Sequence, residues 1–112
     1  MTDHPPELGH NTVSLVGRVS GEVTEHELPS GDHVANFRLV VPRPESSPAG
    51  RATVDTIDVA CWSARTRRTA ARLTEGTVVA VDGSLRRRFF ATSAGRASRY
   101  EVEAVRLRRS RR

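Results

Sequence analysis

Polar and apolar residues alternate along five stretches of the chain, which is the pattern of β-strands with one buried face. In the first stretch Leu15 and Val19 share the apolar parity, while Arg18 falls on the other side. In the second, Phe37 and Leu39 point inward and Arg38 points outward. The strands predicted in this way are 10–19, 34–41, 53–63, 77–90 and 98–107.

Turn and loop signals separate these stretches. Residues 28–32 contain the Pro and Gly of a chain reversal, which predicts a hairpin between the first two strands. Residues 42–51 contain three prolines and a glycine and are predicted to form an exposed loop. A further turn is expected at 93–96, and Gly83 within the fourth strand indicates a bend or bulge.

One short helix is predicted between the third and fourth strands. Ser63 is a suitable N-cap, the helix runs through Leu73, and Gly76 is a typical C-terminal stop. Five strands with a helix between strands three and four match the all-β oligonucleotide/oligosaccharide-binding (OB) barrel. We therefore expect a five-stranded OB-fold barrel.

The length of 112 residues fits a single domain. We expect residues 1–9 to be a flexible N-terminus, 10–107 the barrel, and 108–112 a basic C-terminal tail. The single cysteine, Cys61, excludes an intramolecular disulfide and indicates a reducing compartment. The first ten residues lack the features of a secretory signal, and no apolar run is long enough to cross a membrane. We expect a cytoplasmic protein, associated with the nucleoid.

The basic charge is concentrated near the C-terminal end. Residues 86–112 carry 10 Arg and 2 acidic residues, whereas residues 1–85 carry 8 Arg and 11 acidic residues. A concentrated Arg region on a small domain is typical of a protein that binds a polyanion. A solvated surface or an acidic protein partner would explain the same charge.

No arrangement of residues indicates an enzyme. The four histidines, all within the first 33 residues, do not have the spacing of a zinc site. Asp55 and Asp58 are three residues apart on a strand, so they face opposite sides and cannot act on one substrate. We expect no catalytic residue, no metal and no cofactor.

The outward parity of four strands instead collects cations and aromatic rings. Exposed aromatics beside guanidinium groups offer a surface on which unpaired bases stack while phosphates pair with the cations. Duplex DNA hides its base faces from such a surface. The candidate nucleic-acid-binding residues are Trp62, Phe90, Arg18, Arg38, Arg86 and Arg88, with Arg43, Arg51, Arg96 and Arg99 as further phosphate contacts.

Several of these residues have a plainer interpretation. Trp62 closes a strand and would also serve as a plug at the barrel end, because one bulge reverses its side. Phe89 and Tyr100, like Leu85, share the apolar parity of their strands and are predicted to lie in the core, whereas Glu101 is predicted to face solvent. A single surface Arg is more often solvated or ion-paired than a ligand contact.

Five blocks of the sequence resemble the bacterial single-stranded DNA-binding proteins of the SSB type. The blocks are NTVSLVGRV (11–19), LPSGDHVANFRLVV (28–41), VDTIDVACWS (54–63), GTVVAVDGSLRRRFF (76–90) and SRYEVEAVRL (98–107). The resemblance implies an OB-fold, a homo-oligomer, commonly a tetramer, and single strands wrapped by stacking. It also implies that Trp62 and Phe90 match two of the family's stacking positions.

The chain departs from this family in two respects. Stacking aromatics are common in the family at positions matching Thr56 and the loop near Glu45, where this sequence has none. Family members usually end in an acidic tip that recruits replication and repair enzymes, whereas this sequence ends in Arg-Arg. We expect a short paralogue that does not recruit those enzymes and whose basic tail adds phosphate contacts.

The function predicted from the sequence is therefore sequence-tolerant binding and protection of single-stranded DNA in replication, recombination or repair. Two alternatives remain open. The first is a protein-interaction module, such as a primosome-type OB-fold adaptor. The second is RNA binding, because nothing in the sequence indicates how a 2′-hydroxyl would be selected or rejected.

Overall fold

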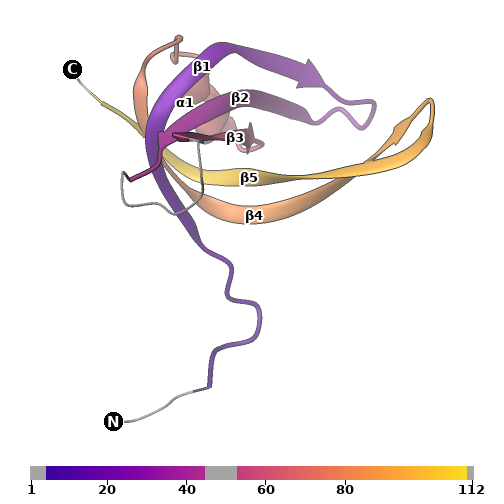
Figure 1. Cartoon of the computed structure of the whole chain (residues 1–112). Coiled ribbons are helices and arrows are strands. Elements are labelled where there is room, and N and C mark those ends of the chain that lie inside the picture. The colour runs from indigo at the N-terminus through magenta and orange to yellow at the C-terminus, as the bar shows by residue number, and fades with distance from the viewer. Residues whose placement is uncertain (1–4, 45–52, 111–112) are drawn as a thin grey trace.

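The computed structural model describes residues 5–44 and 53–110 and has the predicted architecture (Figure 1). Five strands close into a barrel in the order β1-β2-β3-β5-β4, and one short helix lies between β3 and β4 in the sequence. Among the strand pairings of the described residues, only β3–β5 is parallel. The elements are β1 (Val13–Glu27), β2 (His33–Pro42), β3 (Val54–Cys61), α1 (Ala64–Ala70), β4 (Val78–Thr92) and β5 (Gly95–Arg109).

The core consists of the inward parity of the strands, as the alternation predicts. Leu39, Val79 and Val81 are completely buried, and Phe37 and Val102 nearly so. A small barrel has room inside only for packed side chains. Side chains therefore fill its interior.

The first strand is longer than predicted. β1 continues from Val19 to Glu27, and its pairing with β2 shifts between Ser20 and Thr24. Gly21, inside the shift, has φ +77°, a left-handed conformation that glycine adopts without strain. This irregularity bends β1, so that its second half forms a hairpin with β2 that extends from the barrel (Figure 1).

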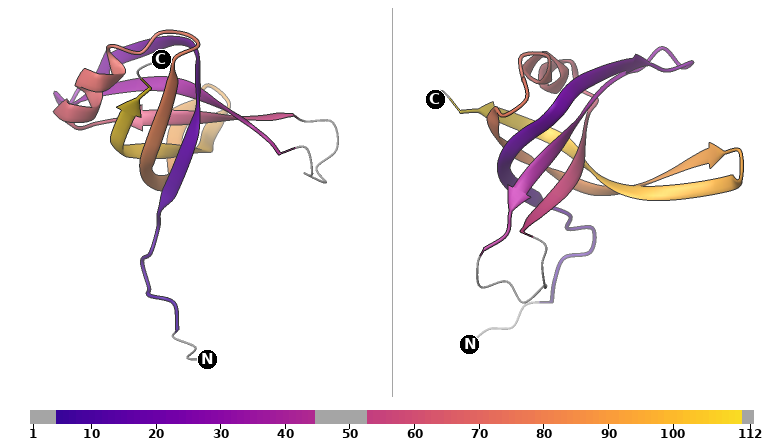
Figure 2. Two further views of the ribbon diagram at one scale, coloured as in Figure 1. Left: turned by 90° about the vertical axis from the view of Figure 1, so that its left-hand side faces the viewer. Right: turned by 45° about the horizontal axis from the view of Figure 1, so that its top comes forward.

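The helix α1 begins where the sequence predicts and ends earlier. The Ser63 side chain accepts a hydrogen bond from the Thr66 N–H at 3.1 Å, which confirms the N-cap. The helix ends at Ala70, and the chain continues through turns to Gly76, whose φ is +89°. Thr66 and Ala70 are buried, so α1 covers one end of the barrel (Figure 2).

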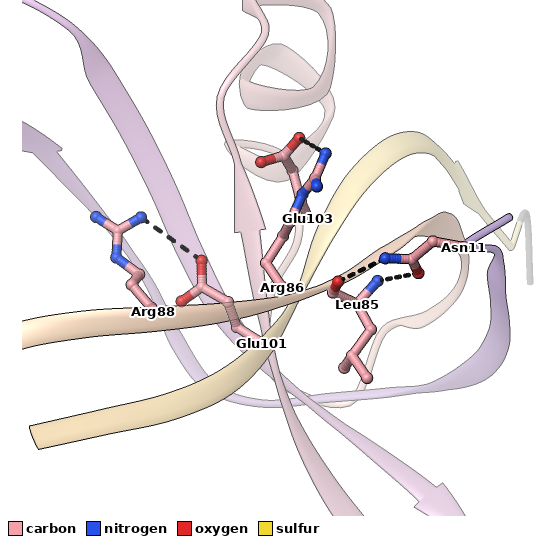
Figure 3. A network of polar contacts seen from close by, with 6 residues as sticks. All are labelled: Asn11, Leu85, Arg86, Arg88, Glu101 and Glu103. Atoms are coloured by element: carbon pink, nitrogen blue, oxygen red, sulfur yellow. Dashed lines mark hydrogen bonds and ion pairs between the residues drawn. The ribbon is translucent and has the colours of Figure 1, made fainter. Parts of the chain in front are cut away.

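Strands β4 and β5 are longer than the barrel and leave it as a two-stranded arm, consisting of residues 85–92 and 95–100 (Figures 1 and 2). The pairing shifts between Asp82 and Gly83, which confirms the irregularity expected at Gly83. A Cβ atom at Gly83 would collide with the Glu103 carbonyl oxygen, so the close approach requires glycine. The Asn11 side chain fastens the base of the arm, because it donates to the Leu85 carbonyl at 2.8 Å and accepts from the Leu85 N–H at 2.9 Å (Figure 3).

Several interpretations of the strand patterns are wrong. Phe89 and Tyr100 were expected in the core but are 60% and 59% exposed, and Leu85 is 45% exposed, because no second layer covers the arm. Glu101, expected to face solvent, is only 3% exposed. Arg108 and Arg109, expected in the basic tail, belong to β5 and pair with β4.

Candidate nucleic-acid interface

The arm has two distinct faces, which follow from its antiparallel register. Residues directly opposite each other in a ladder point to the same side. The pairs Arg86↔Glu101, Arg88↔Arg99 and Phe90↔Ala97 therefore form one side, here called the cleft face. The pairs Arg87↔Tyr100, Phe89↔Ser98 and Ala91↔Arg96 form the other, here called the back face. Figure 3 shows Arg86, Arg88, Glu101 and Glu103 on one side of the two strands and the Leu85 side chain on the other.

On the cleft face, Arg88 joins the arm to the end of β3. Its guanidinium carbon lies 4.8 Å from the centroid of the Trp62 ring, a cation–π distance. The same side chain lies 3.7 Å from a carboxylate oxygen of Glu101. Trp62 is partly exposed, so it is not a buried plug of the barrel.

Phe90 repeats this arrangement farther along the arm. The Phe90 side chain is 42% exposed, and the guanidinium carbon of Arg99 lies 5.9 Å from its ring centroid. Arg99 also pairs with Glu101, at 3.7 Å. Two aromatic rings are thus each accompanied by an arginine, and both arginines share one carboxylate.

A cleft lies beside this face, between the arm and the β1–β2 hairpin. Its volume is about 410 Å³. Arg99 contributes from the arm, Arg38 from β2 and Asp58 from β3, while Asn36 and Thr24 line the hairpin side. The β1–β2 hairpin and the arm project from the same side of the barrel (Figure 1).

The arginines of this region are already paired with carboxylates. Arg38 lies 3.6 Å from Asp58, and Arg86 lies 3.7 Å from Glu103. Ion pairs between exposed groups contribute only about 0–1 kcal/mol each. Replacing the carboxylate partner of such an arginine by a phosphate therefore costs little free energy. Glu101 differs because it is buried, and it holds Arg88 and Arg99 in place beside their rings.

Four of the predicted site residues lie elsewhere or outside the described part of the chain. Arg18 is on the barrel wall, where it pairs in register with Val78 and Val40. Arg96 is on the back face of the arm. Arg43 donates from Nη2 to Asp55 at 2.7 Å, and Arg51 lies outside the described residues.

The Arg43–Asp55 pair has a measurable consequence for ionisation. The hydrogen bond from Arg43 lowers the pKa of the Asp55 carboxyl and raises that of Arg43 itself. Both groups are engaged with each other at the end of β2 and the start of β3. Arg43 therefore fixes the ends of two strands.

Sequence reasoning missed the role of Glu101. Its alternation with Tyr100 placed it outside, and the structure shows that it does belong to the outward parity but is covered by Arg88 and Arg99. A signal was available in the sequence. Arg99 lies two residues before Glu101 on the same strand, and Arg86 and Arg88 lie on the neighbouring strand. A carboxylate among three arginines is expected to become enclosed.

Chemistry of other kinds finds little support in the described residues. Within 5–44 and 53–110, no three His, Cys, Asp or Glu side chains are grouped so as to hold a metal ion. Burial raises the pKa of the Cys61 thiol to about 12, so it remains protonated and unreactive at neutral pH. In the same residues no helix has the length and apolarity to span a membrane.

The chain is similar to known single-strand binding proteins. The model of the single-strand binding protein family matches residues 10–110. The chain belongs to this family. Relatives called single-stranded DNA-binding protein include one from Halalkalibacterium halodurans, 35% identical over 77% of this chain and 51% of the relative, and one from Oceanobacillus iheyensis, 34% identical over 85% and 58%. The chain thus spans about half the length of these relatives.

A solved structure supports the fold of this family member. The chain of the Plasmodium falciparum SSB complex with ssDNA aligns with a TM-score of 0.75, covering 95% of this chain and 99% of that one. At 23% identity the likeness shows a shared OB-fold barrel. The fold and family expected from the sequence are confirmed.

Proposed function

We propose that this chain is a non-catalytic protein that binds single-stranded DNA in the cleft beside the arm. The observation that carries the proposal is the repeated unit on the cleft face, in which Trp62 lies under Arg88 and Phe90 lies beside Arg99. The names of the relatives, which describe single-stranded DNA binding, support the same function.

Base stacking supplies the affinity in this proposal. Each base stacked on an aromatic ring contributes about 1–3 kcal/mol, and every base has a face that stacks. Two rings therefore bind strands with little preference for sequence. Duplex DNA is excluded, because its base faces are covered by neighbouring pairs.

The arginines contact the phosphates. A phosphate that approaches Arg38 takes the place of the Asp58 carboxylate, whereas Arg88 and Arg99 have further N–H donors for phosphates while they remain beside the buried Glu101. Glu101 keeps Arg88 and Arg99 positioned until the strand arrives, so little side-chain ordering is left for the binding step. Arg86 extends the row of cations toward the barrel.

We further propose that the protein acts as a homo-oligomer, a tetramer or a dimer, that coats exposed strands in the cytoplasm during replication, recombination or repair. On the barrel wall Val16 and Val78 are 61% and 47% exposed, and together with Ala80 and Arg108 they line one shallow hollow. Exposed apolar groups that adjoin one another are typical of a subunit contact. Measuring the size of the assembly in solution for the wild type and for Val78→Glu tests this proposal. The variant should form a smaller assembly, and equal sizes would contradict the proposed contact.

The binding proposal is tested with oligo-dT and a duplex of equal length at several salt concentrations. We expect tight binding to oligo-dT alone, with log K falling against log salt by about 0.7 for each phosphate contacted. Equal affinity for both forms would contradict the proposal. Oligo-U in a parallel titration compares RNA with DNA.

A further inference from the structure

The back face of the arm carries exposed aromatic side chains that the proposed interface does not use. Phe89 and Tyr100 are each about three-fifths exposed, and Leu85 adjoins them at the base of the arm. Single exposed apolar side chains are ordinary, but adjoining large ones mark interaction surfaces. These two rings are diagonal neighbours, since Arg87 is opposite Tyr100 and Phe89 is opposite Ser98.

An arginine occupies the space between the two rings. The guanidinium carbon of Arg87 lies 5.4 Å from the centroid of the Phe89 ring and 5.4 Å from that of Tyr100. Its Nε and Nη2 donate to the Ser98 hydroxyl at 3.1 and 3.0 Å. A guanidinium has five N–H donors, so this side chain is held in place while donors remain for a phosphate.

The charge of the back face differs from that of the cleft face. Residues 85–100 contain five Arg and no acidic residue. On the cleft face Glu101 and Glu103, from the following part of β5, offset the arginines. Among the described residues, no carboxylate lies within ion-pair distance of Arg87 or Arg96. The back face is thus positive, aromatic and free of acidic groups.

We propose that the back face is a second stacking surface for single-stranded nucleic acid, with Phe89 and Tyr100 as platforms and Arg87 and Arg96 as phosphate contacts. This inference rests on the proposed function. The arm is a two-stranded ribbon, and Phe89 and Phe90 are consecutive residues that point to opposite sides of it. A strand leaving Phe90 reaches Phe89 by passing around the ribbon.

A second copy of this chain fits the back face less well. In a two-fold contact the same patch meets itself, so Arg87 and Arg96 would approach the same residues of the other copy. Like charges facing each other across an interface oppose association. A polyanion has the complementary charge.

The two faces can be followed separately, because the chain has one Trp and one Tyr. Trp62 emission in the wild type reports on the cleft face. In Trp62→Phe, Tyr100 becomes the fluorophore that reports on the back face, and a ring for stacking remains at residue 62. Both proteins are titrated with oligo-dT of about 8 and about 30 nucleotides, lengths chosen against the ~4–16 nucleotides that one OB-fold covers.

We expect the short oligonucleotide to quench Trp62 and the long one to quench Tyr100 as well. Tyr100 emission unchanged by the long oligonucleotide, with Trp62 quenched, overturns the second surface and leaves the proposed function intact. No response from Trp62 and no binding of either length overturns the proposed function itself. A Tyr100 signal that depends on protein concentration without oligonucleotide assigns the face to a second copy and overturns the inference.

A charge variant provides an independent test. Arg87→Gln is compared with Arg72→Gln, which removes the same charge from an exposed arginine beside α1. We expect Arg87→Gln to weaken binding of the long oligonucleotide several-fold more than Arg72→Gln, with binding of the short one unchanged in both. Equal losses in the two variants would overturn the assignment of Arg87.

Discussion

Two strands of the barrel, β4 and β5, continue into the arm, and the two regions differ in what covers these strands. Within the barrel, β4 and β5 place Val79, Val81 and Val102 against the other strands, and these side chains are buried. Beyond Leu85 the same alternation continues, but its apolar members, Phe89 and Tyr100, are exposed. Alternation thus identifies a strand, whereas burial also requires a second layer. The barrel supplies stability, and in the proposed function the arm offers rings and cations to a ligand.

The largest expected effect separates the two regions by stability. Leu39 is completely buried, so Leu39→Ala should lower the free energy of unfolding by about 2–5 kcal/mol. Phe90→Ala removes a larger side chain from the arm and should cost under about 1 kcal/mol, since its ring is already partly in water. Urea unfolding measures both. Similar losses would show that the arm is part of the cooperative core.

The second largest effect concerns oligonucleotide binding, for which substitutions in the proposed interface should matter most. Trp62→Ala and Phe90→Ala should each weaken the binding of an oligo-dT of about 8 nucleotides by about 1–3 kcal/mol, because each removes a stacking platform. Phe89→Ala is the matched control, since it removes the same ring from the adjacent residue on the back face. The assignment of the cleft face fails if Phe89→Ala reduces short-strand affinity as much as Phe90→Ala does.

A smaller effect on oligonucleotide binding is expected from a substitution of Glu101, whose carboxylate pairs with both Arg88 and Arg99. Glu101→Gln removes the charge opposite Arg88 and Arg99, so phosphates no longer compete with it. Affinity for oligo-dT should rise a few-fold at low salt. Glu103→Gln, which frees Arg86 alone, is the control and should have less effect. Weaker binding by Glu101→Gln would show that positioning of the arginines matters more than their competition.

The smallest effect lies far from the arm, at the Arg43–Asp55 pair. Because Arg43 lowers the pKa of Asp55 in the folded state, the pair stabilises the fold above the unfolded pKa, about 4, and this contribution is lost as the pH falls through the lower folded value. Both side chains remain partly in solvent, so the loss is small. The free energy of unfolding of Arg43→Gln, measured as the pH is lowered, should lack the contribution of this pair. A pH dependence identical to that of the wild type would contradict the prediction.

Much of the fold was accessible from the sequence, because the strand alternation, the Ser63 cap and the Gly83 irregularity are local signals. The extension of β1 to Glu27 was not, since Gly21 resembles a strand end unless the bend is known.

For the site, parity placed Trp62, Phe90, Arg38, Arg86, Arg88 and Arg99 outward, and the register confirms that Phe90, Arg86, Arg88 and Arg99 share one face. Parity predicts on which side of a strand a residue points, but it does not predict where that strand lies around a closed barrel. Arg18 was therefore grouped with residues of the cleft face, although it lies on another part of the barrel wall. Burial of Glu101 depends on long side chains from two strands and left no periodic signal.

The most direct test of the central claim is the emission of Trp62, the single tryptophan, during titration with oligo-dT. If the cleft face binds bases by stacking, emission is quenched at saturation, quenching persists at salt concentrations where binding remains, and an equal concentration of duplex has no effect. Saturable binding of oligo-dT that leaves Trp62 emission unchanged would contradict the account.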